Sequence, residues 1–398
     1  QRLFFRSPAS FSLDLPSNRS GSFRARLTPD GPLNLDARDA RGARAAARKI
    51  NTAVVNPGVL RTSGTSALVA RKVGARLAWS GKLPATLIPG QNSLRACHKN
   101  SALALILDAV RTLNKQPVGC FEQASSANFP LILGVKILDG LPSSPELKTL
   151  RAEMVANIRK GVELLLGYEC KETGGFEWFG KAPCHSTLTA YGLWQFLELS
   201  DLPLSPPVFE YDLLSRLRNF LSTARNGKGG FNISSGLDSL GNPPQDVSDF
   251  YIVMVLSLRF QETQYLFKPE IEIMRTEFSK FQADRESLDS YKLAVLGIFL
   301  LNSGDTKGAR SVAEALAARQ NKSTGEIQKG KTTITKSTGI SLALETTALT
   351  LILFARAELF DLGDTVDLAL NFLTTNMKGG AYPSTQATIL SLMAISDY

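Results

Sequence analysis

Hydrophobic and polar residues alternate over short stretches in the first part of the chain. Residues 10–15 (SFSLDL) and 22–27 (SFRARL) have the two-residue period of half-buried strands, and Pro and Gly residues break the pattern between them. Residues 37–49 are rich in Ala and Arg and predict a short helix. We therefore expect residues 1–95 to form an irregular β-rich or linker region, which we interpret as part of a flanking β-domain.

From about residue 101 the apolar residues recur with the 3.6-residue period of amphipathic helices. Start signals support this pattern: Ser144-Pro145-Glu146 supplies an N-cap, a proline at the first helical position and an acid in the first turn. The period predicts helices at residues 101–115, 123–139, 144–167, 184–199, 206–224, 245–262, 269–284, 288–303, 305–320, 339–359, 362–376 and 384–397.

Three loops between these helices share a double glycine that is followed by an aromatic residue. They are Gly174-Gly175-Phe176, Gly229-Gly230-Phe231 and Gly379-Gly380-Ala381-Tyr382. A tight turn of this kind places a ring against the helix ends. Repeated helical hairpins with such turns favour a closed α/α toroid, with an inner and an outer ring, over an open solenoid. The sequence thus predicts a mainly α fold, with an α/α-toroid domain at residues 96–398.

Composition and charge narrow the function classes without identifying a partner. Of 398 residues, 43% are hydrophobic and 20% are charged, as in ordinary globular proteins. We expect no membrane span, because no apolar run approaches about 18 residues. The net charge of +9 is concentrated in residues 1–98, which hold 16 Lys and Arg against 4 Asp and Glu. The basic stretch Arg38–Arg44 is interpreted as a solvated face, and we expect no nucleic-acid partner.

The cysteines and histidines argue against a metal site. The four cysteines lie at residues 97, 120, 170 and 184, too few for a disulfide scaffold. There is no Cys-x-x-Cys pair, and the histidines are His98 and His185, so a zinc site is disfavoured. We expect no cofactor and no metal. Three Asn-x-Ser sequons, at residues 18, 232 and 321, weakly favour a secreted chain.

Cys120 and Gln123 stand three residues apart at the start of a predicted helix, directly after Gly119. Side chains at this spacing share one helix face, with Cβ atoms about 5–6 Å apart. Three interpretations are open here: an inert core cysteine, a nucleophile, or a cross-link. In the cross-link, the Cys120 thiol attacks the Gln123 carboxamide, expels ammonia and closes an internal thioester. A thioester lasts only while water is excluded, so it needs an aromatic or interdomain cover.

Residues 117–126, PVGCFEQASS, look like the Gly-Cys-x-Glu-Gln motif of the thioester-containing alpha-2-macroglobulin and complement family. The Phe in the middle is similar to the bacterial-type members. Over about residues 80–398, further segments resemble the family in the same order. These are GGFEWFGKAPCHSTLTAYGLWQF, GKGGFN, DSLGNPPQDVSDFYIV, ETTALTLIL and GGAYPSTQATILSLMAI. The resemblance implies an α/α-toroid thioester domain, in agreement with the helical pattern.

The resemblance implies that Cys120 is the thiol donor and Gln123 the acyl carrier, with Gly119 and Glu122 completing the motif. It implies a protease inhibitor rather than an enzyme. In the family a protease cuts a bait region, the molecule rearranges, and amines of the protease become attached at the acyl carbonyl. Complement relatives tag surfaces in innate immunity. The expected location is extracellular, or periplasmic or at the cell surface in a bacterium. The expected partners are proteases or other amine-bearing targets.

This chain departs from a whole family member, because it has no bait region, receptor-binding domain or series of macroglobulin domains. We therefore expect it to be a piece of a larger protein, with the remaining macroglobulin domains as further partners. The match over residues 1–95 is poor.

Several other residues have two interpretations. His185 begins a predicted helix, where it either caps the helix or acts near the thioester. Trp178 and Phe179 either cover the thioester or anchor their loop. Cys170 and Cys184 bracket that loop. They either form a disulfide, in an oxidising compartment, or remain two buried thiols.

In complement relatives a histidine near the stretch resembling residues 229–250 relays the acyl group to hydroxyls. This chain has no histidine there, so we expect direct attack by amines.

Two other function classes stay open. α/α toroids also serve as prenyltransferases, cyclases and polysaccharide-active enzymes, although the zinc ligands and the Asp-x-Asp-Asp acid that two of these need are missing. A non-reactive binding domain is the remaining alternative.

Overall fold

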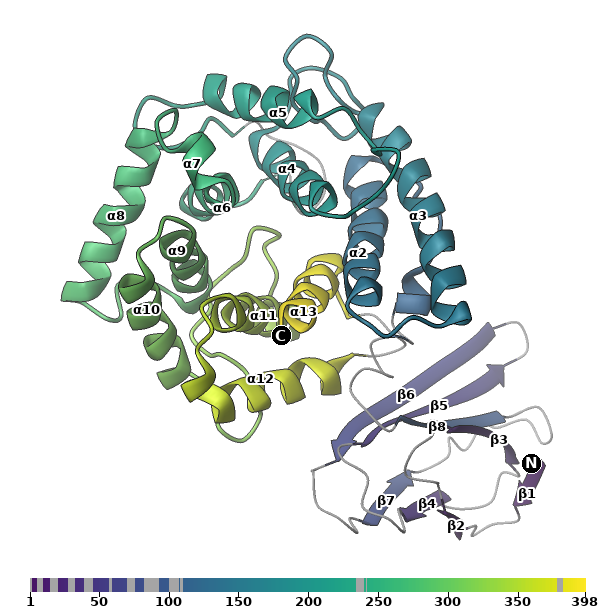
Figure 1. Ribbon diagram of the computed structural model, residues 1–398. Coiled ribbons are helices and arrows are strands. Elements are labelled where there is room, and N and C mark those ends of the chain that lie inside the picture. The colour runs from purple at the N-terminus through teal and green to yellow at the C-terminus, as the bar shows by residue number, and fades with distance from the viewer. Residues whose placement is uncertain are drawn as a thin grey trace. The chain divides into compact units, whose positions relative to one another are not determined.

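The computed structural model describes the eight strands between residues 2 and 99 by their backbone (Figure 1). It further describes residues 107, 110–233, 240, 242–377 and 382–398. The chain divides into two compact units, residues 1–112 with 374–381, and residues 113–373 with 382–398. The boundary between residues 95 and 96 stays a prediction.

The first unit contains two β-sheets. The five-stranded sheet has the order β1 (Arg2–Phe5), β3 (Gly21–Leu27), β8 (Ser93–Lys99), β5 (Ala46–Asn56) and β6 (Val59–Val69). The three-stranded sheet has the order β2 (Ser10–Asp14), β4 (Leu33–Arg38) and β7 (Arg76–Gly81). The predicted β-rich region is confirmed. The helix predicted at residues 37–49 is wrong, because residues 46–56 pair along their backbone with β6 on one side and β8 on the other.

The second unit is an α/α toroid, as predicted (Figure 1). Its inner ring consists of α2 (Phe121–Asp139), α4 (Ser186–Ser200), α6 (Gln245–Ser257), α9 (Ser290–Asn302), α11 (Gly339–Arg356) and α13 (Thr385–Asp397). Each inner helix contacts the next, and α13 contacts α2, so the ring closes. The outer helices are α3 (Pro145–Leu166), α5 (Asp212–Thr223), α8 (Lys268–Ala283), α10 (Thr306–Ala318) and α12 (Gly363–Asn376).

The helices predicted from residue 123 onward are present, with some different ends. The helix predicted at 206–224 begins later, at Asp212, and the pair Pro206-Pro207 lies outside it. The segment predicted at 245–262 divides into α6 and the short α7 (Phe260–Thr263), since Arg259 leaves the helical backbone region. The helix predicted at 101–115 lies largely outside the described residues.

A similar hydrogen bond fixes the loops that lead into four of the inner helices, α4, α6, α11 and α13. In each loop a buried apolar residue donates its backbone N–H to a side-chain oxygen of the following inner helix. The pairs are Phe176–Thr189, Phe231–Asp249, Ile327–Thr347 and Tyr382–Thr388, at 2.8, 2.9, 2.9 and 3.1 Å. The sequence pattern missed the Ile327 loop, where no double glycine and no ring precede the helix. Gly379-Gly380-Ala381 lies outside the described residues.

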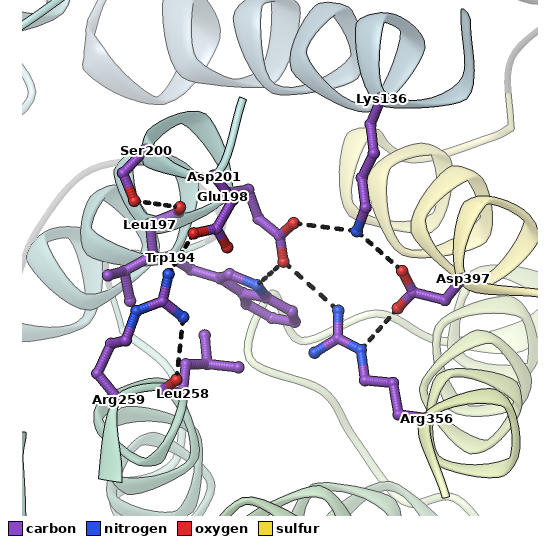
Figure 2. A network of polar contacts seen from close by, with 10 residues as sticks. All are labelled: Lys136, Trp194, Leu197, Glu198, Ser200, Asp201, Leu258, Arg259, Arg356 and Asp397. Carbon is purple, nitrogen blue, oxygen red and sulfur yellow. Dashed lines mark hydrogen bonds and ion pairs between the residues drawn. The ribbon is translucent and has the colours of Figure 1, made fainter. Parts of the chain in front are cut away.

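Charged side chains join four inner helices near their C-terminal ends (Figure 2). Lys136 of α2 contacts Glu198 of α4 and Asp397 of α13, at 3.5 and 3.0 Å. Arg356 of α11 contacts the same two carboxylates, at 3.4 and 2.6 Å, and Trp194 Nε1 donates to Glu198. Although burial alone lowers the pKa of Lys136, its attraction to both carboxylates raises it. The network therefore ties the first inner helix to the last.

The helix α11 alone, among the described residues, is long and apolar enough to cross a membrane by length and composition. The sequence pattern had led us to expect no such segment. Most of α11 is buried between α9 and α13, and it contains the buried carboxylate Glu345. These are the features of a core helix of the toroid.

Candidate functional site

The residues Cys120 and Gln123 lie at the N-terminus of the inner helix α2. Cys120 is the N-cap, with an extended backbone, and Gln123 is the third residue of the helix. They form a capping box in which the Cys120 side chain lies against the Gln123 N–H. In the reverse direction, the Cys120 N–H donates to Gln123 Oε1 at 3.3 Å. The three-residue spacing thus turns the Gln123 carboxamide back over Cys120.

Only a glycine fits before Cys120. Gly119 has a φ of +97°, a region that residues with side chains rarely adopt. A Cβ on Gly119 would overlap Gln123 Oε1 and would lie 3.1 Å from its Cδ. Gly119 therefore permits both the turn into α2 and the close approach of the carboxamide.

The middle residues of the motif anchor it in the core. The Phe121 ring is fully buried and stacks on Phe176, with ring centroids 4.4 Å apart. The Phe121 N–H donates to the Trp178 carbonyl at 2.9 Å, and Trp178 Nε1 donates to Glu122 Oε2 at 3.2 Å. Trp178 and Glu122 are both buried. Trp178 thus holds the first turn of α2 through its backbone and its indole.

A tyrosine that the sequence pattern did not single out also contacts the motif. The Tyr168 hydroxyl donates to the Gly119 carbonyl at 2.5 Å, and its ring meets Phe121 edge-on. Burial, and then its electrostatic interaction with Cys120, raise the pKa of Tyr168 above its ordinary value. No local signal marks this residue, because the contact joins positions 49 residues apart.

The two reactive candidates differ in exposure. Cys120 is buried, whereas the Gln123 side chain is exposed. Two apolar residues beside the site are also exposed. Val118, which precedes the motif, is 66% exposed, and Phe179, which follows Trp178, is 57% exposed. The roles of Trp178 and Phe179 as a cover stay predictions. The buried position of Trp178 and the exposed position of Phe179 mean that they cannot play the same part.

His185 is the N-cap of α4 and is buried. Its Nδ1 accepts the Leu188 N–H at 3.3 Å, and its ring meets Trp178 edge-on at 5.1 Å between centroids. The structure therefore brings His185, Trp178 and Glu122 into one cluster with the motif. Because Nδ1 is occupied as a helix cap, this geometry favours the capping interpretation, and a catalytic role stays a prediction.

The loop that carries Trp178 is closed by a disulfide between Cys170 and Cys184, whose Cα atoms are 6.2 Å apart. A bridge between Glu169 and Phe176 pairs the two sides of this loop. Among the residues whose side chains the structure describes, Cys120 is the one free cysteine, and no group of three His, Cys, Asp or Glu side chains could hold a metal ion.

Two of three comparisons relate the chain to known proteins. A family model described as the A-macroglobulin TED domain matches residues 98–398. No match was found among curated protein sequences. The chain resembles native alpha-2-macroglobulin from Escherichia coli, in a crystal structure from domain MG7 to the C-terminus. The identity is 16% and the TM-score 0.48, over 92% of this chain and 62% of that one.

It also resembles Salmonella alpha-2-macroglobulin reacted with methylamine, at 16% identity and a TM-score of 0.50, over 95% of this chain and 27% of that one. At this identity the likeness concerns the fold alone. The chain spans less than two thirds of the length of either structure.

Proposed function

Because the chain belongs to the A-macroglobulin TED-domain family, we propose that it carries an internal thioester between Cys120 and Gln123 and captures target proteins covalently. The Cys120 sulfur attacks Gln123 Cδ, and ammonia leaves. The product is an acyl thioester, which is far more electrophilic than the carboxamide that it replaces.

One observation carries this proposal, the return of the Gln123 carboxamide over Cys120 in the capping box. The arrangement places the thiol and the carboxamide on the same turn, so that ring closure needs little further ordering. Gly119 supports it, since its missing side chain leaves the space that Oε1 occupies.

Capture follows from attack on the thioester carbonyl. An uncharged amine of the target attacks Gln123 Cδ, an amide forms, and the Cys120 thiolate leaves and takes up a proton. We propose that the targets are proteases, that the whole protein acts as a protease inhibitor in host defence, and that it works outside the cytoplasm. Macroglobulin domains elsewhere in the full-length protein would supply the bait region. They would also cover the exposed Gln123 side chain before activation.

The thioester itself can be tested by mass. Native protein should weigh less than its sequence by one ammonia, and methylamine should label Gln123 and release one thiol at Cys120. Cys120→Ala should abolish labelling and leave the helical circular-dichroism signal intact. A matched control is Cys97→Ala, which removes a cysteine outside the motif and outside the Cys170–Cys184 loop and should keep the labelling. A plain carboxamide at Gln123, with Cys120 free in native protein, would overturn the proposal.

We further propose that the acyl group goes to amines directly. The sequence contains no histidine from residue 186 to 398, and the buried His185 already accepts a cap hydrogen bond. Methylamine should therefore react much faster than glycerol at equal concentration, in the wild type and in His185→Ala alike. Rapid glycerol uptake that disappears in the variant would show that His185 relays the acyl group.

A further inference from the structure

The peptide group between Gly119 and Cys120 is hydrogen-bonded on both of its edges. Its carbonyl oxygen accepts from the Tyr168 hydroxyl at 2.5 Å. Its N–H, which belongs to Cys120, donates to Gln123 Oε1 at 3.3 Å. One rigid planar unit therefore connects the phenol of Tyr168 to the oxygen of the group that would carry the acyl chemistry.

Negative charge develops on that same oxygen during acyl transfer. When sulfur or an amine attacks Gln123 Cδ, the electron pair of the C=O bond moves to Oε1 and a tetrahedral oxyanion forms. A backbone N–H aimed at this oxygen stabilises the oxyanion more than the neutral carbonyl, and so lowers the barrier. The donor distance of 3.3 Å in the ground state can shorten as the charge grows.

We propose that the Cys120 N–H is the oxyanion donor of acyl transfer at Gln123, and that Tyr168 is the positioning residue that orients and polarises it. This inference rests on the thioester function proposed above. Tyr168 acts by donating to the carbonyl of the same peptide group. A hydrogen bond to the carbonyl makes the N–H of that amide a stronger donor, as in any chain of hydrogen bonds.

The neighbouring loop holds the backbone of Tyr168 in place. Tyr168 follows the end of α3, and its carbonyl accepts the Glu177 N–H at 3.2 Å. Gly180 approaches so closely that a Cβ there would lie 3.1 Å from Tyr168 Cα. The disulfide Cys170–Cys184 closes the loop that contains Glu177 and Gly180. With the backbone held in this way, the edge-on contact with Phe121 and the hydrogen bond to Gly119 orient the phenol, as a positioning residue requires.

The step balances without any added group. In capture, the amine nitrogen bonds to Cδ, and the electron pair moves to Oε1, where the Cys120 N–H holds it. The intermediate collapses, the C–S bond breaks with its electrons on Cys120 Sγ, and the proton of the former amine goes to the thiolate or to solvent. In ring closure the same donor serves while the Cys120 sulfur bonds to Cδ, the thiol proton passes to the amide nitrogen, and the C–N bond breaks to release ammonia.

The variant Tyr168→Phe tests the inference, because it removes the hydroxyl and keeps the ring edge against Phe121. The matched control is Tyr265→Phe, which removes the same atom from a side chain that is 87% exposed. The fraction of each protein that carries a thioester is first measured by intact mass. The second-order rate constants for methylamine and for hydroxide are then measured on the thioester that has formed.

The Tyr168 hydrogen bond is already present before attack, so only its strengthening in the transition state changes the rate. Both rate constants should therefore fall by about twofold to threefold in Tyr168→Phe. The factor should be similar for methylamine and hydroxide, because the donor serves the carbonyl oxygen whichever nucleophile attacks. Tyr265→Phe should react as the wild type does.

The outcomes separate this inference from the function on which it rests. If wild-type protein forms no thioester, the proposed function fails and the inference falls with it. If the thioester forms and both variants react at the wild-type rate, only the inference is overturned. A lower thermal midpoint with unchanged rate constants would assign Tyr168 a structural role and overturn it. Faster hydrolysis in Tyr168→Phe would also overturn it, because this would make the hydroxyl a cover against water.

Discussion

Replacing Gly119 with Ala tests the position of the Gln123 carboxamide. Two costs add at this site. A side chain at the φ of +97° costs about 1–2 kcal/mol, because the backbone is in a left-handed region. The new methyl group would also overlap Gln123 Oε1 and lie 3.0 Å from its Cβ, and crowding of this kind costs about 1–3 kcal/mol more.

A matched glycine separates the two costs. Gly304 has a φ of +87°, and a Cβ there would meet no atom within 4 Å. Gly304→Ala should therefore lose only the backbone cost, about 1–2 kcal/mol. Both substitutions are best made in a Cys120→Ala background, in which no cross-link contributes to stability. The free energy of unfolding is then measured by urea denaturation.

The excess cost at Gly119 should depend on Gln123. When Gln123→Ala is added, Oε1 and Cδ are removed, and most of the excess of Gly119→Ala over Gly304→Ala should disappear. With Cys120 present, Gly119→Ala should also prevent the loss of ammonia that marks the thioester. If Gly119→Ala costs no more than Gly304→Ala and the thioester still forms, the carboxamide does not lie where the structure places it, and the reasoning is refuted.

Further predictions concern stability. Burial raises the pKa of Glu345 above 4.5, against the opposing effect of its hydroxyl donors, so wild-type stability should fall as the pH rises through the folded pKa. Glu345→Gln should lack this fall. If the free energies of unfolding of the two proteins depend on pH in the same way from pH 4.5 to 8, the pKa of Glu345 is not raised. Removing Cys170 and Cys184 together should cost about 3 kcal/mol for a loop of about 15 residues, and two alkylatable thiols in the native protein would refute the pairing. Asp397→Asn leaves Lys136 and Arg356 with one carboxylate between them and should cost about 1–3 kcal/mol. The loss should shrink at high salt, because Lys136 is partly exposed, and an unchanged denaturation midpoint would show that the network adds nothing.

The sequence by itself determined the features that depend on neighbours along the chain. The 3.6-residue period located the helices, and helix-start residues such as Ser144 marked their ends, because amphipathicity and capping act within a few residues. The Cys120–Gln123 spacing indicated a pair on one helix turn for the same reason. The helix expected at residues 37–49 shows the limit of this logic, since pairing with two distant strands outweighed local propensity.

Only the tertiary structure decided which distant residues meet at the candidate site. Tyr168 and Trp178 contact the motif from 49 and 56 residues away, and neither contact has a period or a motif that could reveal it. The network that ties α2 to α13 joins Lys136 to Asp397 across 261 residues. These contacts exist because the inner helices close into a ring, which brings the first and last of them together and buries charges that the sequence pattern would leave in solvent.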